Sequence, residues 1–394
     1  MYAEQQVGFV IKGSKNKVYR LEKALYGLRQ APRASYSKIN DHLMQQGFEK
    51  SDCEPTLYKK KEGDDILLVC LYEDDVIYMG SKETMVEDFK QRLMCTFEMS
   101  DLGLLHYFLG LEVKQEEDGV FISQRRYAEG LLKHFQMEKC KSVVTPMNMN
   151  EKLQVEDGTE AADAMRFKSL VGGQMYLTNS RPDIACSVSI LSRFMQAPSK
   201  QHYGAGKRIL RYISGTLDFG IWYSRVPHAI LTGYTDSDWG GSIEDKCSTS
   251  GSVFSLGSGA VTWCSKKQDT VALSTIEDEY IAATTSASQA IWLRRLIGEF
   301  GQDQVEATLL YCDNKSSIAI ASNPVLHGRT KHIKMRFLFI RKLISDGLIN
   351  LKYCHTSDQV ADIMTKALPV QKHVYFRALL GVCSFYSWGS VGAD

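Results

Sequence analysis

The sequence has no long hydrophobic run, no paired cysteines and almost no net charge, and each absence argues against a class of protein. Its longest apolar run, Ile66–Tyr72, is far shorter than the roughly 18 residues that a membrane-spanning helix needs. Glu4 follows Met1 closely, which is unlike a signal peptide. The ten cysteines are scattered singly from Cys53 to Cys383, which argues against a disulfide framework or a zinc ribbon. We therefore expect an intracellular protein of the cytoplasm or nucleus.

The balance of charge excludes a uniformly basic nucleic-acid-binding module. The chain has 47 Lys and Arg residues against 46 Asp and Glu, which gives a formal net charge of +1. Basic residues are instead clustered locally, as at Lys266-Lys267 and Arg294-Arg295, and each cluster can equally be a solvated face. The negative charge of an acidic metal site would offset the positive charge of basic grooves in the net charge, so nucleic acid remains a candidate partner. The 394 residues, 44% of them hydrophobic, are enough for two or three domains with full cores.

Residues 1–136 alternate between helical and extended patterns, as in an α/β protein. Apolar spacing predicts helices at 34–46, at 84–97 and from about 124 to 135. A first hairpin is predicted from strands 65–72 and 76–79, joined by the acidic turn Glu73-Asp74-Asp75. A second hairpin is predicted from strands 105–114 and 119–123.

Residues 149–227 begin as a polar linker up to Asp163, and apolar spacing then predicts helices at 165–178, 182–195 and 200–214. From His228 the predicted order is three strands, a long helix, a strand, two helices, a strand and a helix. The second and third strands, 250–256 and 260–264, pair across Gly257-Ser258-Gly259. We expect a five-stranded mixed sheet over residues 228–380, followed by a tail at 381–394.

Four acidic residues lie at the ends of these C-terminal elements. Asp236 ends a strand, Asp313 closes another, Glu279 lies in the first turns of the long helix and Asp362 opens a late helix. Four converging carboxylates repel one another, by roughly 4 kcal/mol per close pair at an intermediate dielectric. Two Mg²⁺ ions roughly 3.5–4 Å apart would relieve this repulsion and neutralise charge on the attacking and leaving oxygens of a phosphodiester. The pattern predicts a two-metal phosphodiester hydrolase, in which Mn²⁺ can substitute for Mg²⁺.

Two of the acids have close neighbours that could take their place. Asp238 is two residues from Asp236, so both side chains face the same side of a strand, and one can support the other or meet solvent. Glu277 competes with Glu279. Ser274 and Glu277 match a capping box, in which Ser274 caps the helix and Glu277 returns to the cap amide. This structural role for Glu277 favours Glu279 as the metal ligand.

Two further residues have both a structural and a functional interpretation. Asp313 could be a helix N-cap, a position that favours Asp, although the agreement of the other three acids favours the metal site. His355 is expected on a loop beside Asp362, where it could shuttle protons or assist product release. A loop histidine is more often only solvated.

The hairpin turn Tyr72-Glu73-Asp74-Asp75 resembles the YxDD box of reverse transcriptases. Other segments are similar to copia-type retrotransposon polymerases and to their connection region and ribonuclease H: Lys23–Arg33, Asp101–Glu112, Ser169–Gly172, Thr178–Ile184, Tyr234–Trp239, Leu273–Tyr280, Tyr311–Asn314 and Ala361–Lys366. The resemblance covers nearly the whole chain up to Leu380. It implies a partial polymerase palm and thumb at 1–148, a helical connection at 149–227 and a ribonuclease H-like domain at 228–380.

By this resemblance Asp74 and Asp75 would be two of three polymerase carboxylates, and Tyr72 would pack by the primer end. The family's third metal-binding Asp lies before Lys23–Arg33, and the sequence begins past that point, so we expect an incomplete polymerase site. Glu73 stands where the family usually has a small apolar residue, which indicates relaxed constraint on this half.

The resemblance implies that Asp236, Glu279, Asp313 and Asp362 hydrolyse the RNA strand of an RNA–DNA hybrid. Recognition would depend on groove shape and on the 2′-hydroxyls, which distinguish RNA from DNA. The basic pairs Lys266-Lys267 and Arg294-Arg295 are candidates for backbone contacts, which position a strand and carry no sequence preference. The alternative is a non-catalytic transposon remnant that at most binds nucleic acid, with salt-sensitive affinity.

Overall fold

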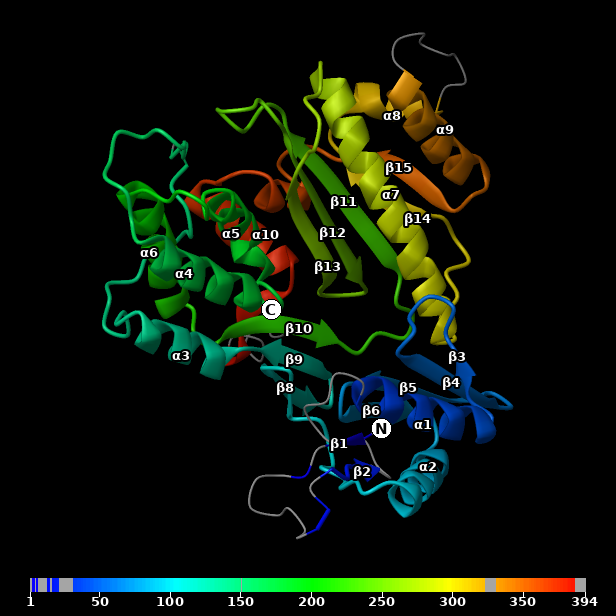
Figure 1. Cartoon of the computed structure of the whole chain (residues 1–394). Helices are drawn as coiled ribbons and strands as arrows, with labels where there is room; N and C mark the ends of the chain where they lie inside the picture. The colour runs from blue at the N-terminus through cyan, green and yellow to red at the C-terminus, as the bar shows by residue number, and fades with distance from the viewer. Residues whose placement is uncertain are drawn as a thin grey trace. The chain divides into compact units, whose positions relative to one another are not determined.

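The computed structural model describes residues 2–3, 5, 13–14, 16–20, 31–149, 151–322 and 331–386. The chain forms two compact units, Met1–Asp101 with Arg295–Gln302, and Leu102–Arg294 with Asp303–Asp394 (Figure 1). Most of the motif Lys23–Arg33 lies outside the described residues. Within the described part of the chain, no helix is both long enough and apolar enough to cross a membrane.

The first unit is built on an antiparallel sheet of order β3-β4-β5-β6. Its elements are β1 (Tyr2–Ala3), β2 (Tyr19–Arg20), α1 (Ala31–Gln45), β3 (Glu49–Lys50), β4 (Leu57–Glu62), β5 (Asp65–Tyr72), β6 (Asp75–Gly80) and α2 (Glu83–Thr96). Alternate residues of β5, Leu67, Val69 and Leu71, face a core that also contains Phe89 of α2. The predicted hairpin at the acidic turn is confirmed, since Tyr72 pairs with Asp75.

The second unit contains a five-stranded sheet of order β16-β10-β9-β8-β7. Its strands are β7 (Tyr107–Phe108), β8 (Leu111–Glu116), β9 (Gly119–Ser123), β10 (Phe219–Ser224) and β16 (Val382–Ser384). The single strand predicted at 105–114 is wrong. Leu109 and Gly110 both have positive φ, 47° and 74°, and reverse the chain in a two-residue hairpin. Strands β10 and β16 were not predicted, because each is short and is completed only by a partner distant in sequence.

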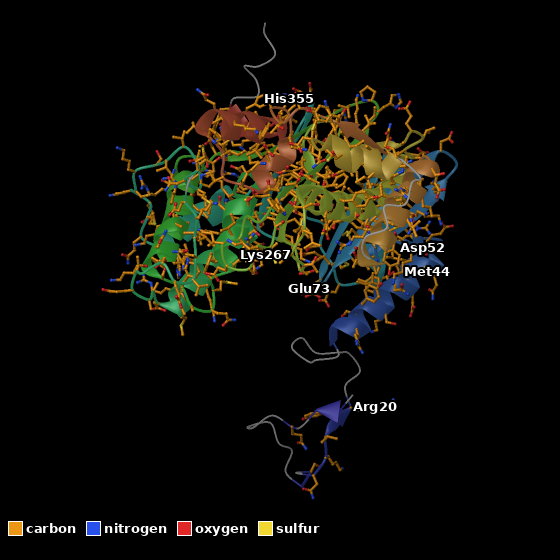
Figure 2. The ribbon with its side chains drawn as sticks, turned by 90° about the horizontal axis from the view of Figure 1, so that it is seen from above. Arg20, Met44, Asp52, Glu73, Lys267 and His355 are labelled. Carbon is orange, nitrogen blue, oxygen red and sulfur yellow. The ribbon has the colours of Figure 1, made fainter. Side chains whose placement is uncertain are left out.

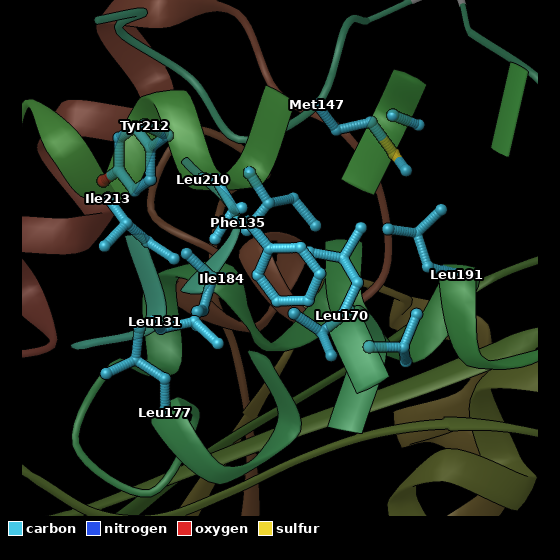
Figure 3. Close-up of a cluster of buried hydrophobic side chains, with 14 of the residues drawn as sticks. Leu131, Phe135, Met147, Leu170, Leu177, Ile184, Leu191, Leu210, Tyr212 and Ile213 are labelled. Carbon is cyan, nitrogen blue, oxygen red and sulfur yellow. The ribbon is translucent and has the colours of Figure 1, made fainter. Parts of the chain in front are cut away.

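Helices pack beside this sheet around a core of their own. They are α3 (Arg125–His134), α4 (Ala164–Leu177), η1 (Pro182–Ile184), α5 (Ala185–Ser192) and α6 (Lys200–Ser214). Leu170, Ile184, Leu191 and Ile213 contribute to this core, and Figure 3 shows their side chains directed toward one another. The three helices predicted between 165 and 214 are confirmed, although the second ends early, at Ser192.

The remaining elements form a mixed sheet of order β13-β12-β11-β14-β15 with helices (Figure 1). They are β11 (Leu231–Asp238), β12 (Thr249–Leu256), β13 (Ala260–Lys267), α7 (Thr275–Glu299), β14 (Thr308–Cys312), α8 (Lys315–Ser322), α9 (Lys331–Ser345), β15 (Ile349–Tyr353), η2 (Val360–Met364) and α10 (Val370–Leu379). Strands β11, β14 and β15 are parallel, whereas β12 and β13 are antiparallel to their neighbours. The α/β class and the five-stranded mixed sheet are confirmed.

A buried ion pair fixes the segment between α4 and α5. Arg181 donates two hydrogen bonds to Asp183, at 2.9 and 2.8 Å, and two more to the carbonyl and hydroxyl of Thr216. Tyr212 donates its hydroxyl to Asp183 at 2.7 Å. Burial by itself raises the pKa of Asp183, but the charge and hydrogen bonds of Arg181 outweigh burial and hold that pKa below its usual value. The motif Thr178–Ile184 therefore has a structural role.

Replacing Asp183 by Asn should destabilise the second unit by about 3–5 kcal/mol, because it leaves the buried Arg181 charge without a counter-ion. Urea unfolding followed by circular dichroism measures this change. Glu129→Gln removes the exposed Arg125–Glu129 pair and is the control, with little expected effect. Equal stabilities of the two variants would contradict this role of the pair.

His373 gives the second unit a dependence of stability on pH. Its ring is 3% exposed, and burial lowers its pKa to about 4 despite the nearby Asp183 charge, while Arg377 and Arg181 lower it further. The unfolded chain, with a His pKa of about 6.5, binds more protons between pH 6.5 and 4. Stability should therefore fall by up to about 3 kcal/mol as the pH drops through that window. In His373→Phe, unfolding free energies measured from pH 7 to pH 4 should lose this slope, and an unchanged slope would contradict the assignment.

Candidate functional site

The four predicted acids converge at one edge of the mixed sheet. Carboxylate oxygens of Asp236, Asp313 and Asp362 lie within 4.8 Å of one another. Asp313 also belongs to a second group of ligand atoms, with Glu279 and the Cys312 thiol, within the same limit. Among the described residues these are the only two groups of three such ligands, and they share Asp313. The structure therefore brings all four acids together.

Parallel pairing of β11 and β14 places Asp236 beside Asp313. Tyr234 pairs with Tyr311, and each acid lies two residues further along its own chain. Asp236 was predicted to end its strand, but β11 continues for two more residues to Asp238, whereas Asp313 directly follows the last residue of β14. Both acids lie on the same side of the sheet as their tyrosines. Asp236 is 1% exposed, and Thr365 donates its hydroxyl to the Asp236 carboxylate. Asp238, the alternative on the same strand, belongs to neither ligand group.

Glu279 reaches the site from the first turns of α7. Ser274 accepts from the Glu277 backbone N–H at 3.2 Å, and the Glu277 carboxylate accepts from the Leu273 N–H at 3.0 Å. Glu277 thus caps the helix, although it returns to the amide of Leu273 and not to that of Ser274 as predicted. Glu279 is 7% exposed, with the Cys312 sulfur 3.9 Å from its Oε2.

Asp313 is not the N-cap of the helix that follows it. That position belongs to Asn314, whose side-chain oxygen accepts from the Ser317 N–H at 3.0 Å. Asp313 is half-buried and accepts a hydrogen bond from the Thr356 hydroxyl at 3.0 Å. The capping interpretation of Asp313 is therefore wrong, and its carboxylate is directed toward the acid cluster.

Asp362 lies on η2, which packs closely on the sheet because Gly251 lacks a side chain. Gly251 is the β12 partner of Asp236, and a Cβ there would be 2.6 Å from Thr365 Cγ2 and 2.8 Å from Met364 Cβ. The buried Gln359 holds the start of η2, accepting from the Ala361 N–H and donating to the Thr235 carbonyl at 3.0 Å. These contacts bring Asp362 next to Asp236.

Two lysines partly neutralise the cluster. Lys366 Nζ lies 2.8 Å from Asp362 Oδ1 and 3.4 Å from Asp236 Oδ2, and Lys372 pairs with Asp362 Oδ2. Burial raises the pKa of Asp236 against the opposing charge of Lys366. Burial, followed by the charges of Asp236 and Asp313, also raises the pKa of Glu279. The site therefore holds more carboxylates than nearby ammonium groups, which favours binding of further cations.

The sequence analysis did not identify Gly251, Gln359 or the two lysines as site residues. Lys366 is four residues after Asp362, a spacing that is ordinary on helix surfaces and does not indicate a buried pair. Asp278 was also missed. It is fully buried, and its Oδ1 accepts from Gln268 at 2.8 Å and from Ser237, so that it joins the start of α7 to the sheet.

His355 lies on the exposed loop between β15 and η2, as predicted, and at the molecular surface (Figure 2). Its Nδ1 accepts from the Ser357 N–H at 3.2 Å, which places the proton of the neutral ring on Nε2. The adjacent Thr356 bonds to Asp313, so the loop is attached to the acid cluster.

The four basic residues that were predicted to contact the nucleic-acid backbone differ in their surroundings. Lys266 and Lys267 end β13. Lys266 is exposed and lies 3.8 Å from Asp269, whereas Lys267 is half-buried and pairs with Asp245. Arg294 instead has a structural position, since it donates to the carbonyls of Gln304 and Glu306 and to the Thr308 hydroxyl. Arg295 is exposed on α7.

The acidic turn of the first unit is open to solvent. Tyr72, Glu73, Asp74 and Asp75 are all exposed, and neither Asp belongs to a group of three ligands among the described residues. Glu73 has a φ of 49°, in the left-handed region that a residue with a Cβ rarely adopts. A small apolar residue with a Cβ, as is usual in the family at this position, would meet the same steric penalty at this φ.

The donor set fits a hard divalent cation. Four carboxylates supply oxygen ligands, which Mg²⁺, Mn²⁺ and Ca²⁺ prefer. Asp236 and Asp362, at 1% and 0% exposure, have two ammonium groups between them. Among the described residues, the donor to the Glu279 carboxylate is the weak thiol of Cys312. Such buried carboxylates need further positive charge.

Comparison with known proteins identifies the chain's relatives. Residues 1–149 match the family described as reverse transcriptase (RNA-dependent DNA polymerase). The chain is 37% identical, over 97% of its length, to the retrovirus-related Pol polyprotein from transposon RE1 of Arabidopsis thaliana. It is also 37% identical, over 98% of its length, to that from transposon TNT 1-94 of Nicotiana tabacum. The chain spans 26% and 30% of these two relatives.

Among solved structures, the chain is similar to a foamy viral protease-reverse transcriptase in complex with dsDNA. The identity is 12% and the TM-score 0.48, with 86% of this chain and 61% of that chain covered. The sequence relatives match nearly the whole chain, through both the acidic turn and the four-acid cluster. The chain therefore belongs to the Pol polyproteins of copia-type retrotransposons.

Proposed function

We propose that the mixed-sheet region, residues 228–380, is a ribonuclease H that hydrolyses the RNA strand of RNA–DNA hybrids. The observation that carries this proposal is the convergence of Asp236, Glu279, Asp313 and Asp362 in two ligand groups that share Asp313. Two overlapping groups suit two neighbouring divalent ions. Membership in the Pol polyprotein family makes a hybrid duplex the expected substrate, because reverse transcription produces one.

Divalent ions held by these residues would neutralise the charge that develops on the attacking water and on the departing 3′-oxygen. The chain's own contribution is to hold the ligands in place. The ends of β11 and β14 fix Asp236 and Asp313, the capped start of α7 fixes Glu279, and Gly251 allows η2 to carry Asp362. Mg²⁺ is the proposed ion, and Mn²⁺ can substitute.

His355 is the proposed proton donor. Its Nε2–H is available because Nδ1 is occupied by Ser357, and its loop is linked to Asp313 through Thr356. An imidazole on this loop can take up a proton and pass it to the departing oxygen, or assist product release.

Lys266, Lys267 and Arg295 are proposed contacts to the nucleic-acid backbone, since all three are basic, with Lys266 and Arg295 exposed and Lys267 half-buried. Arg294 is no longer proposed, because its guanidinium is engaged by carbonyls of the chain itself. The polymerase roles of Tyr72, Asp74 and Asp75 stay predictions from family resemblance. The intracellular location and the domain limits at 148 and 227 stay predictions from the sequence.

The second candidate is a non-catalytic remnant that binds nucleic acid. Glu73, which stands where the family usually has a small apolar residue, favours relaxed constraint in the first unit. The acid cluster of the second unit, in contrast, keeps all four carboxylates, which favours the catalytic candidate. The two candidates differ in one measurement, which is cleavage of a hybrid in the presence of Mg²⁺ or Mn²⁺.

Replacing Asp313 by Asn should lower Mg²⁺-dependent cleavage of an RNA–DNA hybrid at least about 100-fold, because Asp313 is shared by both ligand groups. Cleavage of a labelled RNA strand on denaturing gels measures this rate. Asp346→Asn, at an exposed turn after α9, is the matched control and should cleave at the wild-type rate. Chelation of Mg²⁺ should stop wild-type cleavage. An Asp313→Asn enzyme as active as the wild type would remove the site assignment.

Replacing Gly251 by Ala should lower the cleavage rate about 100-fold while the protein stays folded. The added Cβ displaces Thr365 and Met364, and a shift of about 1 Å in catalytic geometry can cost this much. Gly204→Ala, where the added methyl meets open space on α6, is the control. Rates and circular dichroism spectra of both variants test the prediction. Full activity in Gly251→Ala would show that η2 need not pack this closely.

A further inference from the structure

Lys366 bridges two of the three acids in one ligand group. Its Nζ is 2.8 Å from Asp362 Oδ1 and 3.4 Å from Asp236 Oδ2. Asp236, Asp362 and Asp313 form the group whose oxygens lie within 4.8 Å of one another. The ammonium therefore lies within bonding distance of oxygens that a divalent cation would use.

The surroundings of Lys366 allow its ammonium to leave. Its side chain is 36% exposed, whereas those of Asp236 and Asp362 are 2% and 0% exposed. A lysine side chain is a flexible four-carbon stem with a single charged end, so it can swing toward solvent while the carboxylates stay in place. Both acids would then lose positive charge that their burial requires.

Lys372 is held differently and is a useful comparison. It pairs with the opposite oxygen of Asp362, Oδ2, and also donates to the Thr356 carbonyl at 2.9 Å. No ion pair joins Lys372 to Asp236 within the described residues. Lys372 thus fastens Asp362 to the loop that follows β15, while Lys366 neutralises the pair of acids.

We propose that Lys366 is a built-in competitor of the divalent cation. Its ammonium neutralises Asp236 and Asp362 when no divalent ion is bound there, and it must leave both carboxylates before such an ion can bind. Lys366 therefore sets the metal concentration at which the site fills, and it keeps the clustered acids from repelling one another below that concentration. This inference rests on the proposed function, because it concerns the same carboxylates.

The affinity for a divalent cation tests the proposal without reference to catalysis. Ca²⁺ is titrated by calorimetry, at fixed pH and ionic strength, into the whole chain and into its Lys366→Met variant. The variant should bind Ca²⁺ about tenfold more tightly, a change of about 1.4 kcal/mol, because the competing ammonium is gone. Lys372→Met should gain less. Lys200→Met, which removes an exposed pair with Glu160, should leave the affinity unchanged.

Thermal unfolding gives a second readout that a purely structural lysine would not produce. In chelator, Lys366→Met should have a lower Tm than the wild type, because Asp236 and Asp362 have lost a counter-ion. At saturating Ca²⁺ the difference should close, since the bound ion replaces the lysine and stabilises the folded state. A lysine with only a packing role would lower the Tm equally in both conditions.

The outcomes separate this inference from the proposed function. A folded Lys366→Met protein with unchanged or weaker Ca²⁺ affinity overturns the competition while leaving the ribonuclease H proposal in place. An equal loss of Tm with and without Ca²⁺ overturns it as well. A wild-type protein that binds neither Ca²⁺ nor Mg²⁺ overturns the proposed function, and the inference with it.

Discussion

Mutual repulsion among buried carboxylates is the constraint around which the second unit is organised. Asp236, Glu279 and Asp362 are each less than a tenth exposed, and Asp313 joins their two ligand groups. Burial and like charge both disfavour such a cluster, as the raised pKa values of Asp236 and Glu279 show. The surrounding residues must therefore hold the acids in position against a force that separates them.

The scaffold meets this requirement with contacts between elements distant in sequence. Gln359 connects η2 to β11, Asp278 connects α7 to the sheet through Ser237 and Gln268, and Asn314 takes the capping role beside Asp313. Because polar groups inside a protein are costly when unpaired, each of these hydrogen bonds fixes its segment in one arrangement. Catalytic geometry thus depends on residues that need never touch a substrate.

A buried ion pair further from the acids also helps to hold the site in place. The buried pair of Arg181 and Asp183 fixes η1, which contacts both η2 and α10. Through these contacts the connection between α4 and α5 supports the segment that carries Asp362. The sequence motif Thr178–Ile184 thereby has a physical explanation, which is a buried charge that must keep its partner.

Local pattern was sufficient for much of the molecule. Apolar spacing predicted most helices, turn sequences between strands predicted the hairpins around residues 73 and 258, and positions at the ends of predicted elements singled out the four acids. Prediction failed where a strand is completed by a partner distant in sequence, where the chain reverses inside a predicted strand, and where a side chain binds its own chain. Strands β10 and β16 exist through pairing across about a hundred residues or more, Leu109 reverses a predicted strand, and Arg294 binds carbonyls of its own chain.

The sequence by itself determined which residues carry charge, which segments are amphipathic and which motifs match the Pol family, because these depend on residue type and spacing. Only the tertiary structure decided that Glu279 and not Glu277 faces the cluster, that Gly251 lets η2 approach, and that Lys366 lies between Asp236 and Asp362. The physical reason is that burial and charge pairing depend on distances between segments far apart in the chain, which no local pattern encodes.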